Sequence, residues 1–102
     1  MTSQGNGPPV LYVVRLSGMA RDEVKARYQE AVASGRGWRF LSALVKINEQ
    51  LRHQPVSFGD PLYRLPALRL QVFQCAIAPL VVQYGVHEEL PLVFIRKVLL
   101  LS

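Results

Sequence analysis

The side chains best suited to chemistry on a phosphate are cations in the second half of the sequence. Arg69 alternates with Leu68, Leu70 and Val72 in a period of two, which is typical of a strand with one buried face. This phase places Arg69 on the face away from the apolar side chains, where a guanidinium could bind a phosphate or contact RNA. The alternative is an arginine that only faces solvent.

A second candidate is the pair formed by Tyr63 and Arg64, just before this run. A tyrosine ring stacks on bases and an arginine binds phosphates, so the pair suits RNA. The alternative is that the pair closes a loop over the core. Gln71 and Gln83 lie in alternating stretches, and we assign them to the same RNA- or partner-binding set.

His87 is followed by Glu88 and Glu89, and a histidine beside carboxylates is a candidate general base. The alternative is a histidine in an exposed turn.

Arg96 and Lys97 are adjacent in the last apolar stretch. Because neighbouring residues of a strand point to opposite faces, we expect only one of them to share a face with Arg69. The alternative is that this pair suppresses aggregation of an apolar strand.

The other reactive side chains form no recognised motif. His53 and His87 are far apart and give no metal-ligand spacing, and a single cysteine, Cys75, excludes a disulfide within the chain. We expect no metal and no cofactor, and we predict that Cys75 is a small core residue. Trp38 is predicted to pack in the core, with a partner-binding anchor as the alternative.

The elements that must position these side chains follow from the hydrophobic pattern. We predict strands at 10–16, 68–73, 80–87 and 92–101, helices at 18–34 and 38–54, and a linker at 56–66. The order β-α-α-β-β-β indicates an α+β fold, in which a two-helix hairpin covers one face of a small antiparallel sheet. The other face is left open for binding. We expect the apolar end of the last strand to pack on the first helix or to pair with another chain.

Composition limits the classes of protein to consider. The chain has 102 residues, of which 50% are apolar and 19% are charged, and its net charge is +5. This size fits one domain, which we place at 10–102, after a flexible segment at 1–9. The positive charge indicates an acidic partner, such as nucleic acid or an acidic protein segment. With no signal-peptide pattern and no apolar run long enough for a membrane, we expect a cytoplasmic protein.

The order of these elements and several phrases resemble the RelE/ParE superfamily of bacterial toxins. The phrase VVRLSGMARDEVKARYQEA is similar to that family's first strand and first helix. Further stretches that resemble the family's loop and strands are residues 59–65, 68–72, 80–86 and 92–95. The resemblance covers about residues 10–98.

The resemblance implies the toxin of a type II toxin–antitoxin pair, neutralised by a cognate antitoxin. RelE-like members cleave mRNA in the ribosomal A site, where the 2′-hydroxyl attacks the adjacent phosphate and cations stabilise the developing charge. On this interpretation Arg69, Arg96 and His87 are the catalytic candidates, and Lys97 joins the RNA- or partner-binding set.

The sequence departs from the family pattern at two places. Pro79 or Leu80 stands where the family has an arginine, and residues 97–102 lack the histidine and tyrosine of the family's tail. Enzyme activity therefore stays open. The alternative is a member that acts by protein binding, either a ParE-like inhibitor of DNA gyrase or an inactive relic that binds a partner. A homodimer and an unrelated α+β binding module are further alternatives.

Overall fold

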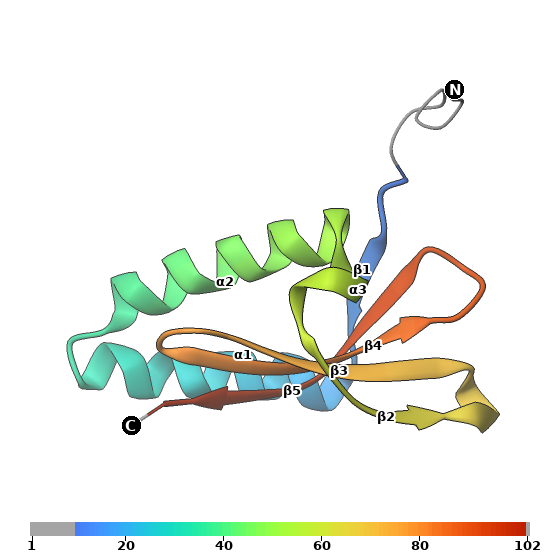
Figure 1. Cartoon of the computed structure of the whole chain (residues 1–102). Helices are drawn as coiled ribbons and strands as arrows, with labels where there is room; N and C mark the ends of the chain where they lie inside the picture. Colours follow the sequence, from blue (N-terminus) through green and yellow to red (C-terminus); the bar gives the residue numbers. More distant parts are fainter. Residues whose placement is uncertain (1–9, 102) are drawn as a thin grey trace, which may run out of the picture.

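Two long helices lie on one face of a five-stranded sheet (Figure 1). The computed structural model describes residues 10–101, so the predicted segment 1–9 and Ser102 lie outside the described residues. In chain order the elements are β1 (Val13–Leu16), α1 (Gly18–Ala33), α2 (Gly37–His53), α3 (Pro55–Phe58), β2 (Asp60–Leu65), the 3-10 turn η1 (Pro66–Leu68), β3 (Leu70–Ile77), β4 (Leu80–His87) and β5 (Leu92–Leu100). The predicted α+β class, with a helix pair over one face of a sheet, is confirmed.

The sheet is mixed rather than wholly antiparallel. Its strand order is β1-β5-β4-β3-β2, and β3, β4 and β5 form the predicted antiparallel meander. β1 pairs in parallel with β5, from Val13 beside Leu92 to Leu16 beside Ile95. Parallel neighbours need a long connection, and the chain between these two strands includes both helices and the rest of the sheet.

β2 is a strand that the sequence pattern did not predict. Its residues fall in the predicted linker 56–66, where Pro61 and Pro66 indicated turns. β2 forms the edge of the sheet opposite β1, is almost wholly exposed and pairs with β3 alone. A proline, which lacks an N–H, is tolerated at such an edge, and the pairing is irregular between Pro61 and Tyr63.

The two long helices pack on the sheet through different side chains. Ser17 caps α1, since its Oγ accepts the N–H of Ala20 at 3.0 Å. α1 packs closely through the fully buried Ala20 and Ala31, whereas Val32 is exposed. In α2 the core residues Phe40, Ala43, Ile47 and Leu51 recur at spacings of three and four residues, which places them on one side of the helix.

Trp38, at the start of α2, is 82% exposed, so the prediction that it packs in the core is wrong. Phe40 is fully buried, and residues two apart on a helix lie on nearly opposite sides. Once Phe40 faces the sheet, Trp38 must face solvent.

Tyr84 is the largest fully buried side chain and joins the sheet to α3. Its hydroxyl donates to the carbonyl of Pro55 at 2.7 Å, and its ring stacks on Phe73 with centroids 5.5 Å apart. Gly59 passes so close to this hydroxyl that a Cβ there would collide with it. Cys75 is buried in the same core, as predicted.

Candidate nucleic-acid interface

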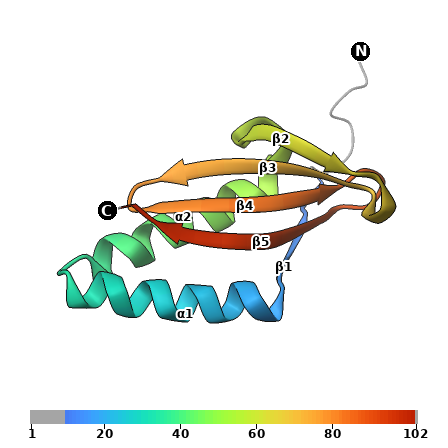
Figure 2. The ribbon, with the colours of Figure 1, turned by 90° about the horizontal axis from the view of Figure 1, so that it is seen from below.

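The face of the sheet away from the helices is the candidate site (Figure 2). Phe73 and Tyr84 point into the core, so the side chains that alternate with them on β3 and β4 point the other way. Cross-strand pairs on that side are Leu70–His87, Val72–Gly85 and Gln74–Gln83. We call this side of the sheet the open face.

β5 adds two adjacent cations to the open face through a β-bulge. β4 pairs with Lys97 and with Ile95, which leaves Arg96 as an extra residue between them. Ile95 and Val98 both enter the core although they are three residues apart, so Arg96 and Lys97 both lie on the open face. The prediction that only one of these cations could share a face with Arg69 assumed strict alternation, which fails at this bulge.

Arg15 on β1 is a third cation of the open face, and the sequence analysis did not single it out. Arg15 pairs with Phe94, while the next pair along, Leu16 and Ile95, packs into the core. Arg15 therefore shares the face of Phe94. The alternation within Val13–Leu16 was the signal that could have found it.

These three cations give the open face an unbalanced positive charge. Among residues 10–101, Arg15, Arg96 and Lys97 form no ion pair. Arg15 and Lys97 are exposed and Arg96 is half-buried. Such a group of uncompensated cations on one surface attracts a polyanion.

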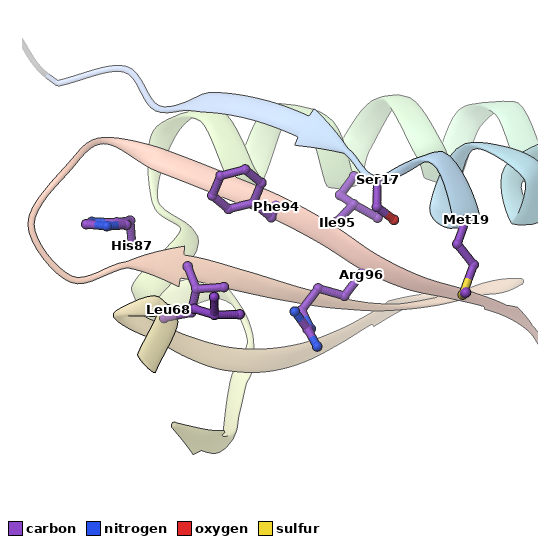
Figure 3. A pocket seen from close by; sticks show the side chains of 8 residues that line it. Ser17, Met19, Leu68, His87, Phe94, Ile95 and Arg96 are labelled. Atoms are coloured by element: carbon purple, nitrogen blue, oxygen red, sulfur yellow. The ribbon is translucent and has the colours of Figure 1, made fainter. Parts of the chain in front are cut away.

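A pocket of about 550 Å³ opens on this face (Figure 3). Its lining includes Met19, Leu68, Leu70, His87, Phe94 and Arg96. Figure 3 shows Phe94 and Arg96 reaching in from β5, His87 from the end of β4 and Met19 from the start of α1. The lining is mainly apolar, with an aromatic ring and a few N–H donors. A flat ring that carries hydrogen-bond acceptors, such as a nucleobase, fits this combination.

His87 lies at a strand end beside two glutamates, as predicted, but its hydrogen bonds do not suit a general base. Its Nδ1 accepts the backbone N–H groups of Glu89 at 3.1 Å and Leu90 at 3.0 Å. The lone pair of Nδ1 is thus in use, and neutral histidine then carries its proton on Nε2. In this arrangement His87 can donate a hydrogen bond from Nε2 but has no free nitrogen to accept a proton.

The alternation around Arg69 predicted a position in the middle of a strand, but the structure places Arg69 just before β3. It follows the 3-10 turn and has a φ of 54°, because Pro66 starts that turn and breaks the strand phase. Its Nη1 donates to Oε1 of Glu89 at 2.6 Å. The Arg69 guanidinium is therefore paired at the end of the sheet rather than displayed on its open face.

Arg64 forms a second pair of the same kind. Its Nη2 donates to Oε1 of Glu88 at 2.9 Å, and its Nε donates to Oε2. These hydrogen bonds hold the pKa of Glu88 below its ordinary value. The N–H of Glu88 also donates to the carbonyl of Arg69 at 2.9 Å. We call the pairs Arg64–Glu88 and Arg69–Glu89 the turn clasp, because they join the end of β2 and the β2–β3 turn to the β4–β5 turn.

Of the remaining predicted residues, Gln83 and Tyr63 lie on the open face. Gln83 pairs with Lys97 in register and donates from Nε2 to Oε1 of Gln74 at 3.1 Å. Tyr63, at the far edge of the sheet, pairs with Val72.

Gln71 belongs to the opposite row of β3. It pairs with Val86, whose side chain faces the helices, and it donates to the carbonyl of Tyr63 at 2.9 Å. The structure thus groups Arg96, Lys97, His87 and Gln83, and separates Gln71 and the two arginines of the turn clasp from them.

Neither a membrane-spanning helix nor a metal-binding cluster occurs in the part of the chain that the structure describes. Within residues 10–101, no helix is both long and apolar enough to cross a bilayer. In the same range, no three His, Cys, Asp or Glu side chains gather so that they could hold a metal ion.

Comparison with known proteins identifies the fold. No family model matches the sequence, and no curated protein matches it. A chain in the RelBE2 toxin–antitoxin complex of Mycobacterium tuberculosis superposes with a TM-score of 0.59 and 23% identity, over 89% of this chain and 92% of that one. A chain of the chromosomal ParDE toxin–antitoxin system of P. aeruginosa gives a TM-score of 0.60 and 10% identity, over 90% and 98%.

Proposed function

On this RelE/ParE-like toxin fold, we propose that the protein is the toxin of a toxin–antitoxin pair and that its open face binds RNA. The single observation that carries the proposal is the grouping of Arg15, Arg96 and Lys97, all without ion pairs among residues 10–101, around an apolar pocket that contains Phe94. Cations bind the phosphates and an aromatic ring stacks on a base, which together describe a surface for single-stranded RNA.

The reaction that we propose is RelE-like cleavage of mRNA on the ribosome. The 2′-oxygen attacks the adjacent phosphorus, the bond to the 5′-oxygen breaks, and a cyclic phosphate remains. In this proposal Arg96 and Lys97 stabilise the extra negative charge on the phosphorus-bound oxygens. The proton of the 2′-hydroxyl leaves to water, since His87 uses its Nδ1 lone pair for Glu89 and Leu90. The departing 5′-oxygen takes its proton from water, and the Nε2–H of His87 is available to donate a hydrogen bond to this oxygen.

The hydrogen bonds of His87 also favour a second candidate function. A protein that poisons its target by binding, as a ParE-like inhibitor of DNA gyrase does, needs no group that moves protons. The open face would then bind an acidic surface of the target. RNA cleavage separates the two candidates.

A cognate antitoxin is the partner that we propose for the helical side of the molecule. Trp38, Leu41 and Val45 form an exposed apolar stripe along α2, at spacings of one helical face. A groove of about 330 Å³ lies beside it, lined in part by Leu44 and Val24. Exposed cations on α2, Arg39 and Lys46, favour a partner helix with acidic flanks.

The test of function is a purified translation reaction in which mRNA ends are mapped by primer extension. We expect new ends within codons at the ribosomal A site, strongly reduced by Arg96→Ala or Lys97→Ala. Lys46→Ala is the matched control, because Lys46 is an exposed lysine on α2, away from the open face. Intact mRNA with wild-type protein would contradict the cleavage proposal and leave protein binding as the function to test.

A further inference from the structure

One side of β5 loses its strand partner halfway along. β1 ends at Leu16, which pairs with Ile95. Residues 96–100 of β5 therefore have no neighbouring strand on the side away from β4. α1 packs against this part of β5 instead, as Figure 2 shows. Backbone N–H groups on that side of β5 therefore need partners from α1 or from water.

Glu23 of α1 provides one such partner. Its Oε1 accepts the backbone N–H of Val98 at 2.8 Å. Val98 is fully buried and Glu23 is half-buried, so this N–H would otherwise lose water without gaining a hydrogen bond. A charged acceptor makes this bond stronger than one between neutral groups.

The position of this contact along β5 matters for the open face. Val98 is the first residue after the bulge, directly following Lys97. A strand without the bulge would shift by one residue, which would turn Lys97 toward α1 and Val98 toward the open face. Holding Val98 in the core therefore also holds the bulge, and the bulge keeps two successive cations on one surface.

We propose that Glu23 is a positioning residue for RNA binding: its carboxylate fixes the bulge that places Arg96 and Lys97 together on the open face. This inference rests on the proposed function of that face. Glu23 acts through β5 and does not itself contact RNA.

Two variants separate positioning from simple electrostatics. Glu23 is an acid, so if only its charge mattered, Glu23→Ala and Glu23→Gln would both strengthen RNA binding by removing a repulsion. Positioning predicts opposite results for the two, since Gln keeps an oxygen that accepts the N–H of Val98 and Ala does not. We expect Glu23→Ala to weaken binding of a single-stranded RNA oligomer by about threefold to tenfold. Glu23→Gln should bind as well as the wild type or better.

The comparison is made by fluorescence anisotropy at one salt concentration, with thermal denaturation to show that each variant is folded. In a protein that already lacks both cations, Arg96→Ala with Lys97→Ala, the further change Glu23→Ala should weaken binding no more. Equal or tighter binding by Glu23→Ala than by Glu23→Gln would overturn the proposal.

Hydrogen exchange at the Val98 amide gives an answer that does not depend on RNA. Exchange should be faster in Glu23→Ala than in the wild type and should stay slow in Glu23→Gln. An unchanged rate in Glu23→Ala would overturn the positioning role. If the wild type binds no RNA at all, the proposed function fails, while exchange at the Val98 amide still shows whether Glu23 protects this N–H beside the bulge.

Discussion

Arg15 of β1 lies beside Phe94 of β5 in the parallel register, so a guanidinium and an aromatic ring share the open face. This contact joins residues from the two ends of the chain, because β1 enters the sheet next to the last strand. A base stacked on Phe94 would have its backbone phosphates close to a cation. The pair thus combines the two interactions on which binding of single-stranded RNA depends.

Arg15→Ala should remove one phosphate contact. The slope of log affinity against log salt concentration should become shallower by about 0.7, the contribution of one phosphate on a single strand. Arg15 is exposed and unpaired among residues 10–101, so the melting temperature should change little. Arg39→Ala, which removes an exposed arginine from α2, serves as the control. An unchanged slope for Arg15→Ala would exclude Arg15 from the interface.

Phe94→Leu should weaken RNA binding while keeping most of the apolar volume beside the pocket. Loss of an aromatic–base stack costs about 1–3 kcal/mol per base, whereas a swap between apolar side chains of similar size usually costs less in folding. RNA titration and urea denaturation of the same preparation measure the two effects. Equal RNA affinity, with a lower free energy of unfolding, would show that Phe94 is only structural.

Arg69→Ala should weaken RNA binding much less than Arg96→Ala. The charge of Arg69 is balanced by Glu89, which it contacts at 2.6 Å, whereas Arg96 has no ion pair among residues 10–101. Parallel RNA titrations of the two variants make the comparison. Equal losses would mean that the turn clasp opens and that Arg69 binds phosphate in the complex.

Cys75 should make the folded state less stable at high pH. Burial raises the pKa of its thiol to about 11 from an ordinary value of 9.0, so folding favours the protonated thiol. This contribution is complete below pH 9 and is lost as the pH rises toward 11, by at most about 1.4 kcal/mol per pH unit.

The variant Cys75→Ala isolates this effect. The difference in free energy of unfolding between wild type and variant should shrink as the pH rises through this window. Denaturant titrations at several pH values measure it, and Tyr84, whose pKa is also raised by burial, is present in both proteins. A difference that does not change with pH would show that the thiol ionises as easily in the folded protein as in the unfolded one.

The parts of the fold that the sequence predicted are those set by local periodicity. Phe40, Ile47 and Leu51 of α2 recur with the helical period and are buried, and β4 alternates regularly and lies in the middle of the sheet. β2 was not predicted because Pro61 and Pro66 indicate turns; Pro66 does start a turn, but Pro61 lies in an edge strand, which tolerates a proline. The parallel pairing of β1 with β5 depends on contacts between distant residues, which periodicity does not encode.

The candidate site was harder to predict than the fold. Arg69 alternates like a strand residue, yet Pro66 starts a turn that carries it away from the open face. The bulge at Arg96 arises because the core takes both Ile95 and Val98, a constraint visible only once the helices and sheet are packed. Arg15 could have been predicted from the alternation of its strand. Only the parallel register shows that it lies beside Phe94.

The most direct measurement is the salt-dependent binding of single-stranded RNA to two triple variants that lose the same charge. One combines Arg15→Ala, Arg96→Ala and Lys97→Ala on the open face. The other combines Arg21→Ala, Arg39→Ala and Lys46→Ala, which remove exposed cations of α1 and α2. We expect the first variant to make the slope of log affinity against log salt concentration shallower by about 2, which is the sum of three phosphate contacts. The second variant should leave this slope nearly unchanged. Equal losses in both, or a larger loss in the helical variant, would contradict the assignment of RNA binding to the open face.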